Sequence, residues 1–303
     1  MIFLAACAPS VNAPEPAAAP VKKPKSTAAP LELFDPTSLA PPVEYAAKWR
    51  AGVQAKYLLP IDGLVAKDGG FDLVIHFHGG QVADKEWRNS GINAAIAIVT
   101  LGVGSGVYSE AYADPDRLGK LTDEIEGIVA DQTPNKAVHV RRIGLVSWSA
   151  GYGATQRILT QPRYAPLVDA VVLLDGLHAD YHDRVAHKVD IRPILPFVRF
   201  AGEAAQKKKQ MVITFSSVEP GAYASAREST IALLDAVAVK PEVRDQQVWM
   251  GMRMILEAHE GDLHARGFAG DAPDDHASQL KLTEEMVRRH LVPRWNKMAK
   301  EQP

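Results

Sequence analysis

The sequence predicts an α/β fold in which a mostly parallel central sheet has helices on both faces. From about Leu31, strand-like apolar runs alternate with helix-like stretches, which is the pattern of parallel strands joined by crossover helices. Some runs, such as residues 94–101, are apolar without alternation and therefore suit strands that are covered on both sides. With 47% hydrophobic and 23% charged residues, the chain can form a substantial core.

The individual elements follow from these runs in chain order. The strands are predicted at residues 54–60, 71–77, 94–101, 143–147, 170–174, 211–215 and 252–258. The helices are predicted at residues 121–131, 152–159, 228–239 and 277–290. The long segment 177–210 is a candidate lid. We see no internal repeat, and interpret residues 31–303 as one domain.

Charge and cysteine content exclude several classes of protein. The formal net charge of −2 argues against a broad polyanion-binding surface, so nucleic acid is not expected as a partner. A single cysteine, Cys7, excludes an internal disulfide and a thiolate-rich zinc site. No apolar run approaches the roughly 20 residues needed to span a bilayer.

Residues 1–30 differ from the rest in composition. The segment Leu4-Ala5-Ala6-Cys7 resembles the lipobox of bacterial lipoproteins, which are lipidated on the cysteine, although the signal segment is short and lacks a basic start. The Ala- and Pro-rich stretch that follows is typical of a disordered tether. We therefore expect a lipid-anchored protein of the bacterial cell envelope, or a secreted one. The alternative is a misplaced start codon and a cysteine there by chance.

The segment 145–153, Leu-Val-Ser-Trp-Ser-Ala-Gly-Tyr-Gly, carries the strongest chemical signal. A buried strand runs into a turn of small residues and then into a helix, as a nucleophile elbow of the G-x-S-x-G type requires. Ser149 occupies the nucleophile position, Ser147 replaces the first glycine, and Gly151 matches the second. The alternative is a small-residue turn without chemistry.

A second motif, His76-Phe77-His78-Gly79-Gly80, follows an apolar strand upstream. An HGG-type loop supplies a backbone N–H to the oxyanion hole, and the residue after the nucleophile, Ala150, supplies another. His76 and His78 could instead be metal ligands, because alternate residues on a strand share a face. No acidic cluster follows to complete such a site, so we predict no metal and no cofactor.

The order of these motifs resembles that of the α/β-hydrolase fold, from roughly Tyr45 onward. The resemblance implies a Ser, acid, His order for the catalytic residues. Asp175 at the end of strand 170–174 is the favoured acid, with Glu219 as the alternative. The base lies after the last strand: His276, just before the C-terminal helix, is favoured over His264, and His259 is weaker.

The resemblance implies a serine hydrolase that cleaves carboxylic esters, either small-molecule or lipid-like, through an acyl-enzyme. His178 and His182 are expected at the rim of its site. A peptidase or amidase with the same triad is one alternative, and a non-catalytic envelope binding protein with the same fold is another. A metal-dependent hydrolase using His76 and His78 is a third, which a chelator would inactivate.

Overall fold

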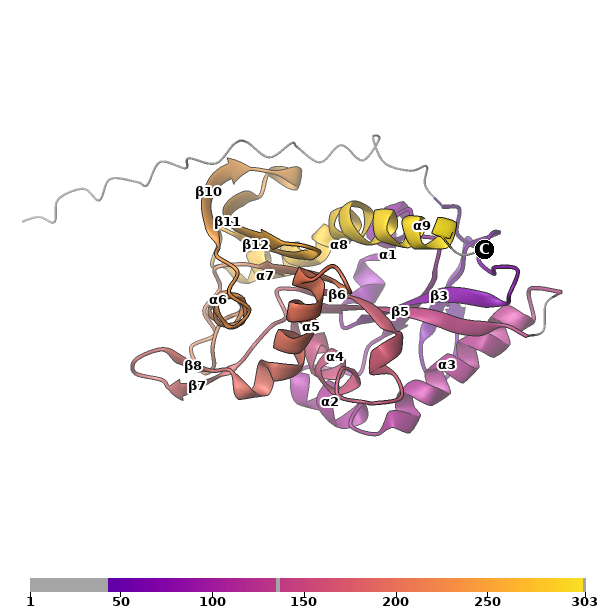
Figure 1. Cartoon of the computed structure of the whole chain (residues 1–303), viewed down its shortest axis with the longest axis horizontal. Helices are drawn as coiled ribbons and strands as arrows, with labels where there is room; N and C mark the ends of the chain where they lie inside the picture. Colours follow the sequence, from indigo (N-terminus) through magenta and orange to yellow (C-terminus); the bar gives the residue numbers. More distant parts are fainter. Residues whose placement is uncertain (1–42, 135–136, 302–303) are drawn as a thin grey trace, which may run out of the picture.

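The apolar runs of the sequence build a ten-stranded sheet at the centre of the molecule (Figure 1). The computed structural model of the protein describes residues 43–134 and 137–301, so the predicted tether and Cys7 lie outside the described residues. Within that part of the chain, no helix is both long enough and apolar enough to cross a membrane.

The sheet has the strand order β1-β2-β4-β3-β5-β6-β9-β12-β11-β10. Its strands are β1 (Arg50–Ala51), β2 (Lys56–Leu58), β3 (Gly70–Phe77), β4 (Ala95–Val99), β5 (His139–Trp148), β6 (Val168–Leu174), β9 (Gln210–Phe215), β10 (Glu242–Gln247), β11 (Arg253–Glu260) and β12 (Leu263–Phe268). The six strands from β4 to β12 in this order run parallel, whereas β1 and β2 at one end and β11 and β10 at the other pair antiparallel. The predicted mostly parallel sheet is confirmed.

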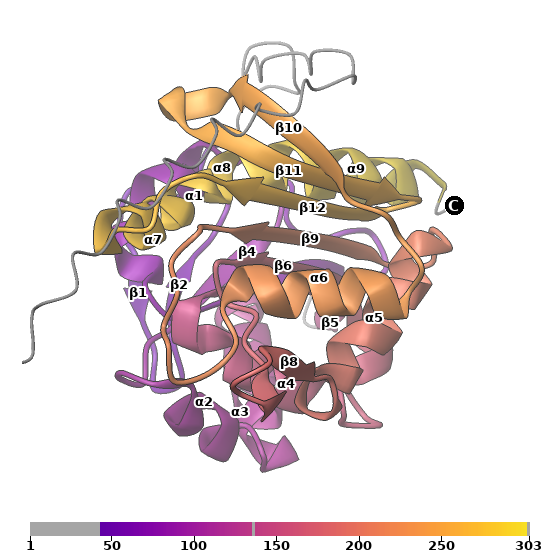
Figure 2. The same ribbon diagram turned by 90° about the vertical axis from the view of Figure 1, so that its left-hand side faces the viewer.

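Two layers of helices cover the sheet, one on each face (Figures 1 and 2). One layer packs on a core that includes Phe71, Leu73 and Ile75 of β3, and the other on a core that includes Val74 of the same strand. The first layer contains α2 (Ser105–Ala111), α3 (Pro115–Ala130), α4 (Tyr152–Ile158), α5 (Leu195–Ala205) and α6 (Ala226–Ala236). The second contains α1 (Asp84–Asn89), α7 (Pro273–Gln279), α8 (Thr283–Met286) and α9 (Val292–Glu301).

The C-terminal part of the sheet differs from the sequence prediction. The predicted last strand, 252–258, is β11, and a further strand, β12, follows after a turn at Gly261 and returns antiparallel to it. The predicted helix 277–290 starts earlier, at Pro273, and continues to Glu301 as a series of helical segments. Strand β12 was missed because His264, Arg266 and Gly267 interrupt its apolar pattern.

The candidate lid, residues 177–210, contains a small hairpin and α5. The hairpin consists of β7 (Asp180–Asp183) and β8 (Lys188–Asp190), which pair only with each other. It lies apart from the main sheet, beside the first helix layer (Figures 1 and 2). Helix α5 follows the hairpin and leads to β9. Its buried side chains include Phe197 and Phe200.

Both edges of the sheet are poor templates for a further strand. Strand β1 has only two residues. Strand β10 carries charged residues, of which Arg244 pairs with Glu242 and Glu257, and Asp245 with Arg253.

His76 is a fully buried polar residue of the central strand β3. Its Nδ1 accepts a hydrogen bond from Trp87 Nε1 at 2.9 Å. Burial lowers the pKa of His76 to about 3, so the imidazole is neutral in the folded protein. In the unfolded chain its pKa is about 6.5.

The free energy of unfolding should therefore fall on acidification, because the unfolded chain binds a proton at His76 that the folded one does not. The folded pKa is depressed, so this contribution is complete above about pH 6.5 and is lost towards pH 3. In His76→Asn, which can still accept from Trp87, the loss of stability between pH 7 and pH 5.5 should shrink by roughly 1 kcal/mol. Urea unfolding of both proteins at the two pH values measures it, and equal pH dependence would show that His76 is not buried as a neutral group.

Candidate active site

The predicted site residues lie on one side of the molecule, where the carboxyl ends of the parallel strands are. Ser149 directly follows β5, Asp175 follows β6, and His78 follows β3. Each of these three non-glycine residues has a positive φ, of 48°, 46° and 67° respectively. Such angles are uncommon outside glycine and mark places where the surrounding structure forces a sharp turn.

Ser149 stands at the strand–turn–helix junction that the sequence predicts. A turn of 3-10 helix, Ser149–Gly151, links β5 to α4. A Cβ atom on Gly151 would overlap the carbonyl oxygen of Phe77 on β3, so only glycine allows this close approach. The Ser147 hydroxyl is turned away from this edge, into a buried hydrogen bond of 2.7 Å with Thr155 Oγ1.

Asp175 is a buried carboxylate with defined partners. It is only 3% exposed. Its Oδ1 accepts from the backbone N–H of Ser216 at 3.0 Å, and its Oδ2 from the Ser216 hydroxyl at 2.5 Å. These bonds, from the residue that follows β9, fix the carboxylate in one orientation and compensate for its burial.

His276 lies against this carboxylate, 101 residues further along the chain. Its Nδ1 is 2.8 Å from Asp175 Oδ2, and its side chain is 27% exposed. Its ring stacks on the indole of Trp148, with centroids 5.0 Å apart, and Trp148 Nε1 donates to the His276 carbonyl oxygen at 3.1 Å. The residue before Ser149 thus holds His276 next to the elbow.

His78 stacks on Trp148, with ring centroids 5.1 Å apart. Its Nδ1 is 2.9 Å from the Tyr108 hydroxyl. Burial, and to a smaller extent the positive charge of His276, lower the pKa of His78, so it stays neutral when a proton arrives at His276.

A cavity of about 540 Å³ opens beside the elbow, and Ser149, Ala150 and His78 are among the residues that line it. Gly79 and Gly80 are not part of its lining, but form the turn next to Trp148 at the start of a 3-10 helix. Gly79 has φ 70°, and a Cβ there would come within 2.5 Å of the Trp148 ring. The first N–H groups of a helical turn have no partner within it, which applies to Gly80 and to Ala150.

The alternative acid and the alternative base take no part in the contact between Asp175 and His276. Among the described residues, Asp175 is the only carboxylate hydrogen-bonded to His276, whereas Glu219 lies in an exposed loop. The prediction placed His264 in a loop. It lies instead near the start of β12, whereas Ser149 and Asp175 follow the ends of their strands. There it pairs with His259 and its ring packs against His290.

Four further histidines that the sequence analysis named also have defined positions. His178 lines the cavity, as expected for a rim residue, whereas exposed His182 does not. The expectation that His76 and His78 share a face is wrong, because the positive φ of His78 turns its ring towards Tyr108 while His76 contacts Trp87. Within residues 43–134 and 137–301, no three His, Cys, Asp or Glu side chains are grouped so that they could hold a metal ion.

The elbow follows the central strand of a mostly parallel sheet that is covered on both faces, with an acid after the next strand and a histidine after the last. The chain has the α/β-hydrolase fold. No protein-family model matches the sequence, and no match to it is found among curated proteins.

Three solved structures of this fold are similar to the chain. A cold-adapted esterase from an Arctic intertidal metagenomic library is 10% identical, with a TM-score of 0.42, over 78% of this chain and 87% of its own. The ferric enterobactin esterase of Salmonella typhimurium is 12% identical, with a TM-score of 0.46, over 86% of this chain and 63% of its own. The acylaminoacyl peptidase of Pyrococcus horikoshii is 12% identical, with a TM-score of 0.35, over 66% of this chain and 36% of its own. The chain thus spans less than two thirds of the length of the last two.

Two residues that shape the site were not identified in the sequence analysis. Trp148 lies inside the elbow motif, but its contacts with two imidazoles depend on loops that are distant in the chain. Ser216 follows a predicted strand, and this position at the carboxyl edge is the signal that could have found it.

Gly151→Ala should destabilise the hydrolase fold, because the added methyl group meets the backbone of β3 and neither segment can move freely. We expect the free energy of unfolding to fall by about 1–3 kcal/mol, as for other overpacked cores. The matched control is Gly127→Ala in α3, where a Cβ meets nothing within 4 Å and should stabilise the helix by up to about 1 kcal/mol. Denaturant unfolding of the two variants measures the contrast, and similar stabilities would contradict the close approach at Gly151.

Proposed function

We propose that the protein is a serine hydrolase that cleaves carboxylic esters through an acyl-enzyme, with Ser149, His276 and Asp175 as its catalytic residues. The observation that carries the proposal is the contact of His276 Nδ1 with the buried carboxylate of Asp175, beside a serine in a turn with positive φ. Such a carboxylate holds the imidazole in one tautomer, with Nε2 free to take a proton.

In this mechanism the Ser149 hydroxyl attacks the carbonyl carbon of the ester while His276 Nε2 takes its proton. The imidazolium that forms is stabilised by Asp175 and by the face of the Trp148 ring on which it lies. His276 then gives the proton to the leaving alcohol. Water, activated by the same imidazole, attacks the acyl-enzyme and releases the acid.

The tetrahedral oxyanion would be held by the backbone N–H of Ala150 and by an N–H of the Gly79–Gly80 turn. Each lies at the start of a helical turn, where N–H groups have no partner within the turn and can donate to an anion. Loss of one donor of this kind costs about 2.7–4 kcal/mol of transition-state stabilisation.

A fluorophosphonate probe should label the wild-type protein and fail to label Ser149→Ala, because only an activated serine is phosphonylated. Hydrolysis of p-nitrophenyl acetate should fall at least about 10³-fold in the same variant. Ser147→Ala is the matched control, since its hydroxyl is bonded to Thr155 in the core, and it should still be labelled. A folded wild type that is never labelled would sink the serine mechanism and favour a binding protein.

The assignment of the base and the acid is tested by two pairs of variants. His276→Gln and Asp175→Asn should lower kcat by roughly 10³–10⁴-fold, because the proton acceptor or its orienting partner is lost. His264→Gln and Glu219→Gln should leave kcat within about threefold of the wild type, because neither side chain takes part in the contact between Asp175 and His276. Steady-state kinetics measures all four variants, and a collapse in either of the last two would reverse the assignment.

Attachment to the bacterial envelope through a lipidated Cys7 is proposed on the lipobox-like sequence alone. A tethered enzyme of this kind would act on small-molecule or lipid-like esters at the envelope.

A further inference from the structure

The side-chain charge that lines the cavity beside Ser149 is acidic and not basic. No lysine or arginine is among the residues that line it, and Asp180 is their only carboxylate. Asp180 is the first residue of β7, so the small hairpin brings this negative charge to the cavity. At about 540 Å³ the cavity is large enough to enclose the acyl or alcohol part of a small ester.

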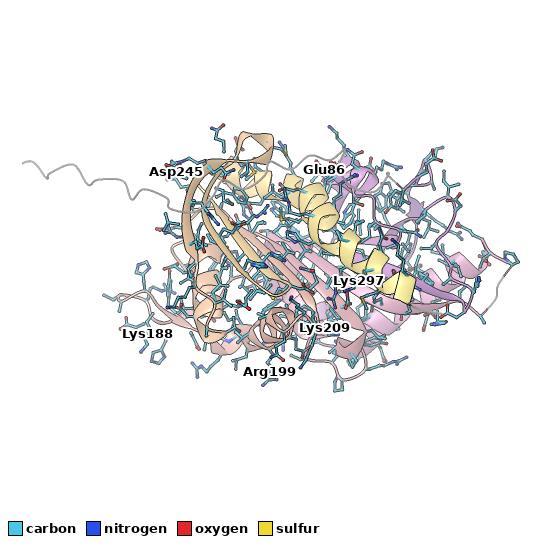
Figure 3. All side chains as sticks on the ribbon, turned by 45° about the horizontal axis from the view of Figure 1, so that its top comes forward. Glu86, Lys188, Arg199, Lys209, Asp245 and Lys297 are labelled. Atoms are coloured by element: carbon cyan, nitrogen blue, oxygen red, sulfur yellow. The ribbon has the colours of Figure 1, made fainter. Side chains whose placement is uncertain are left out.

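The charge of Asp180 is not neutralised by the hairpin that carries it. No ion pair to Asp180 is found in the described part of the chain, and the arginines nearest in sequence have other partners. Arg184 donates to the carbonyl oxygen of Ala222 at 2.7 Å, and Arg192 forms an ion pair with Asp190 at 2.6 Å. Figure 3 shows Lys188, the remaining strong base of the hairpin, at the outer end of the molecule.

Aromatic rings line the same cavity. The His178 ring makes edge contacts with Tyr152 and Tyr223, at centroid distances of 5.7 and 5.1 Å. Burial lowers the pKa of His178, so this imidazole adds no positive charge. Burial also raises the pKa of Tyr152, which lines the same cavity as Asp180 and stays a neutral phenol. Neutral rings beside an unpaired carboxylate are the chemistry that binds an organic cation.

We propose that the part of the substrate that occupies this cavity carries a cationic group, an ammonium or a guanidinium, held by Asp180 and the rings of Tyr152 and Tyr223. The inference rests on the proposed function and names its substrate class. The apolar side chains of Val103 and Pro193, which also line the cavity, suit the hydrocarbon part of such a substrate.

The test compares three p-nitrophenyl esters of similar length. One is a hexanoate with a terminal trimethylammonium group, the second its neutral tert-butyl isostere, and the third carries a terminal carboxylate. For the wild type, kcat/KM should be about 5- to 30-fold higher for the cationic ester than for the neutral one, and lowest for the anionic ester. Because Asp180 is exposed, added salt should reduce this preference.

Asp180→Asn should lower the cationic-to-neutral ratio about five- to tenfold and remove its dependence on salt. Asp180→Lys should invert the ratio in favour of the anionic ester. The matched control is Asp235→Asn, which removes the same charge from an exposed position of α6 and should leave the ratio unchanged.

The outcomes separate this inference from the proposed function. If Ser149 is labelled and the esters are cleaved, but the ratio is the same in Asp180→Asn as in the wild type, the cation subsite is wrong and the hydrolase proposal stands. A wild type that prefers the neutral or the anionic ester overturns the subsite as well. If Ser149 is unlabelled and no ester is cleaved, both proposals fail together.

Discussion

The candidate site depends on one constraint, the parallel direction of the strands at the centre of the sheet. Six neighbouring strands are covered on both faces, so their interiors can hold few polar groups. The polar side chains of the candidate site lie instead where the chain leaves each strand. Because the strands are parallel, the residues that follow β3, β5, β6 and β9 meet at a single edge, although they are far apart in sequence.

Packing at this edge determines the electrostatics of the site. Ser216 holds the buried carboxylate of Asp175, and Trp148 separates two imidazoles that would repel each other if both were charged. Burial lowers the pKa of His78, which favours the neutral form of this ring, and His276 is the imidazole that contacts the carboxylate. The cavity beside Ser149, by contrast, is lined in part by the chain around the β7–β8 hairpin, which contributes the exposed Asp180.

Local signals in the sequence predicted the parallel sheet and the elbow at Ser149. Continuous apolar runs suit strands that are buried on both faces, and small residues at a strand end allow the sharp turn into a helix. The resemblance to the α/β-hydrolase fold ranked Asp175 and His276 first. It could not give their separation, since the chain between them folds through four further strands of the main sheet. Strand β12 was missed because polar residues interrupt its pattern, and His264 was therefore assigned to a loop. Trp148 was overlooked because a sequence does not reveal which rings a side chain will stack on.

The two ends of the sheet have a consequence for how the molecule behaves at high concentration. A long, flat and apolar edge strand would recruit the same strand of another molecule and start an aggregate. Here one end is the two-residue strand β1, and the other is β10, whose charges are paired within its own sheet. Neither outermost strand of this ten-stranded sheet is therefore suited to pair with a strand of a second molecule, which disfavours edge-to-edge polymerisation.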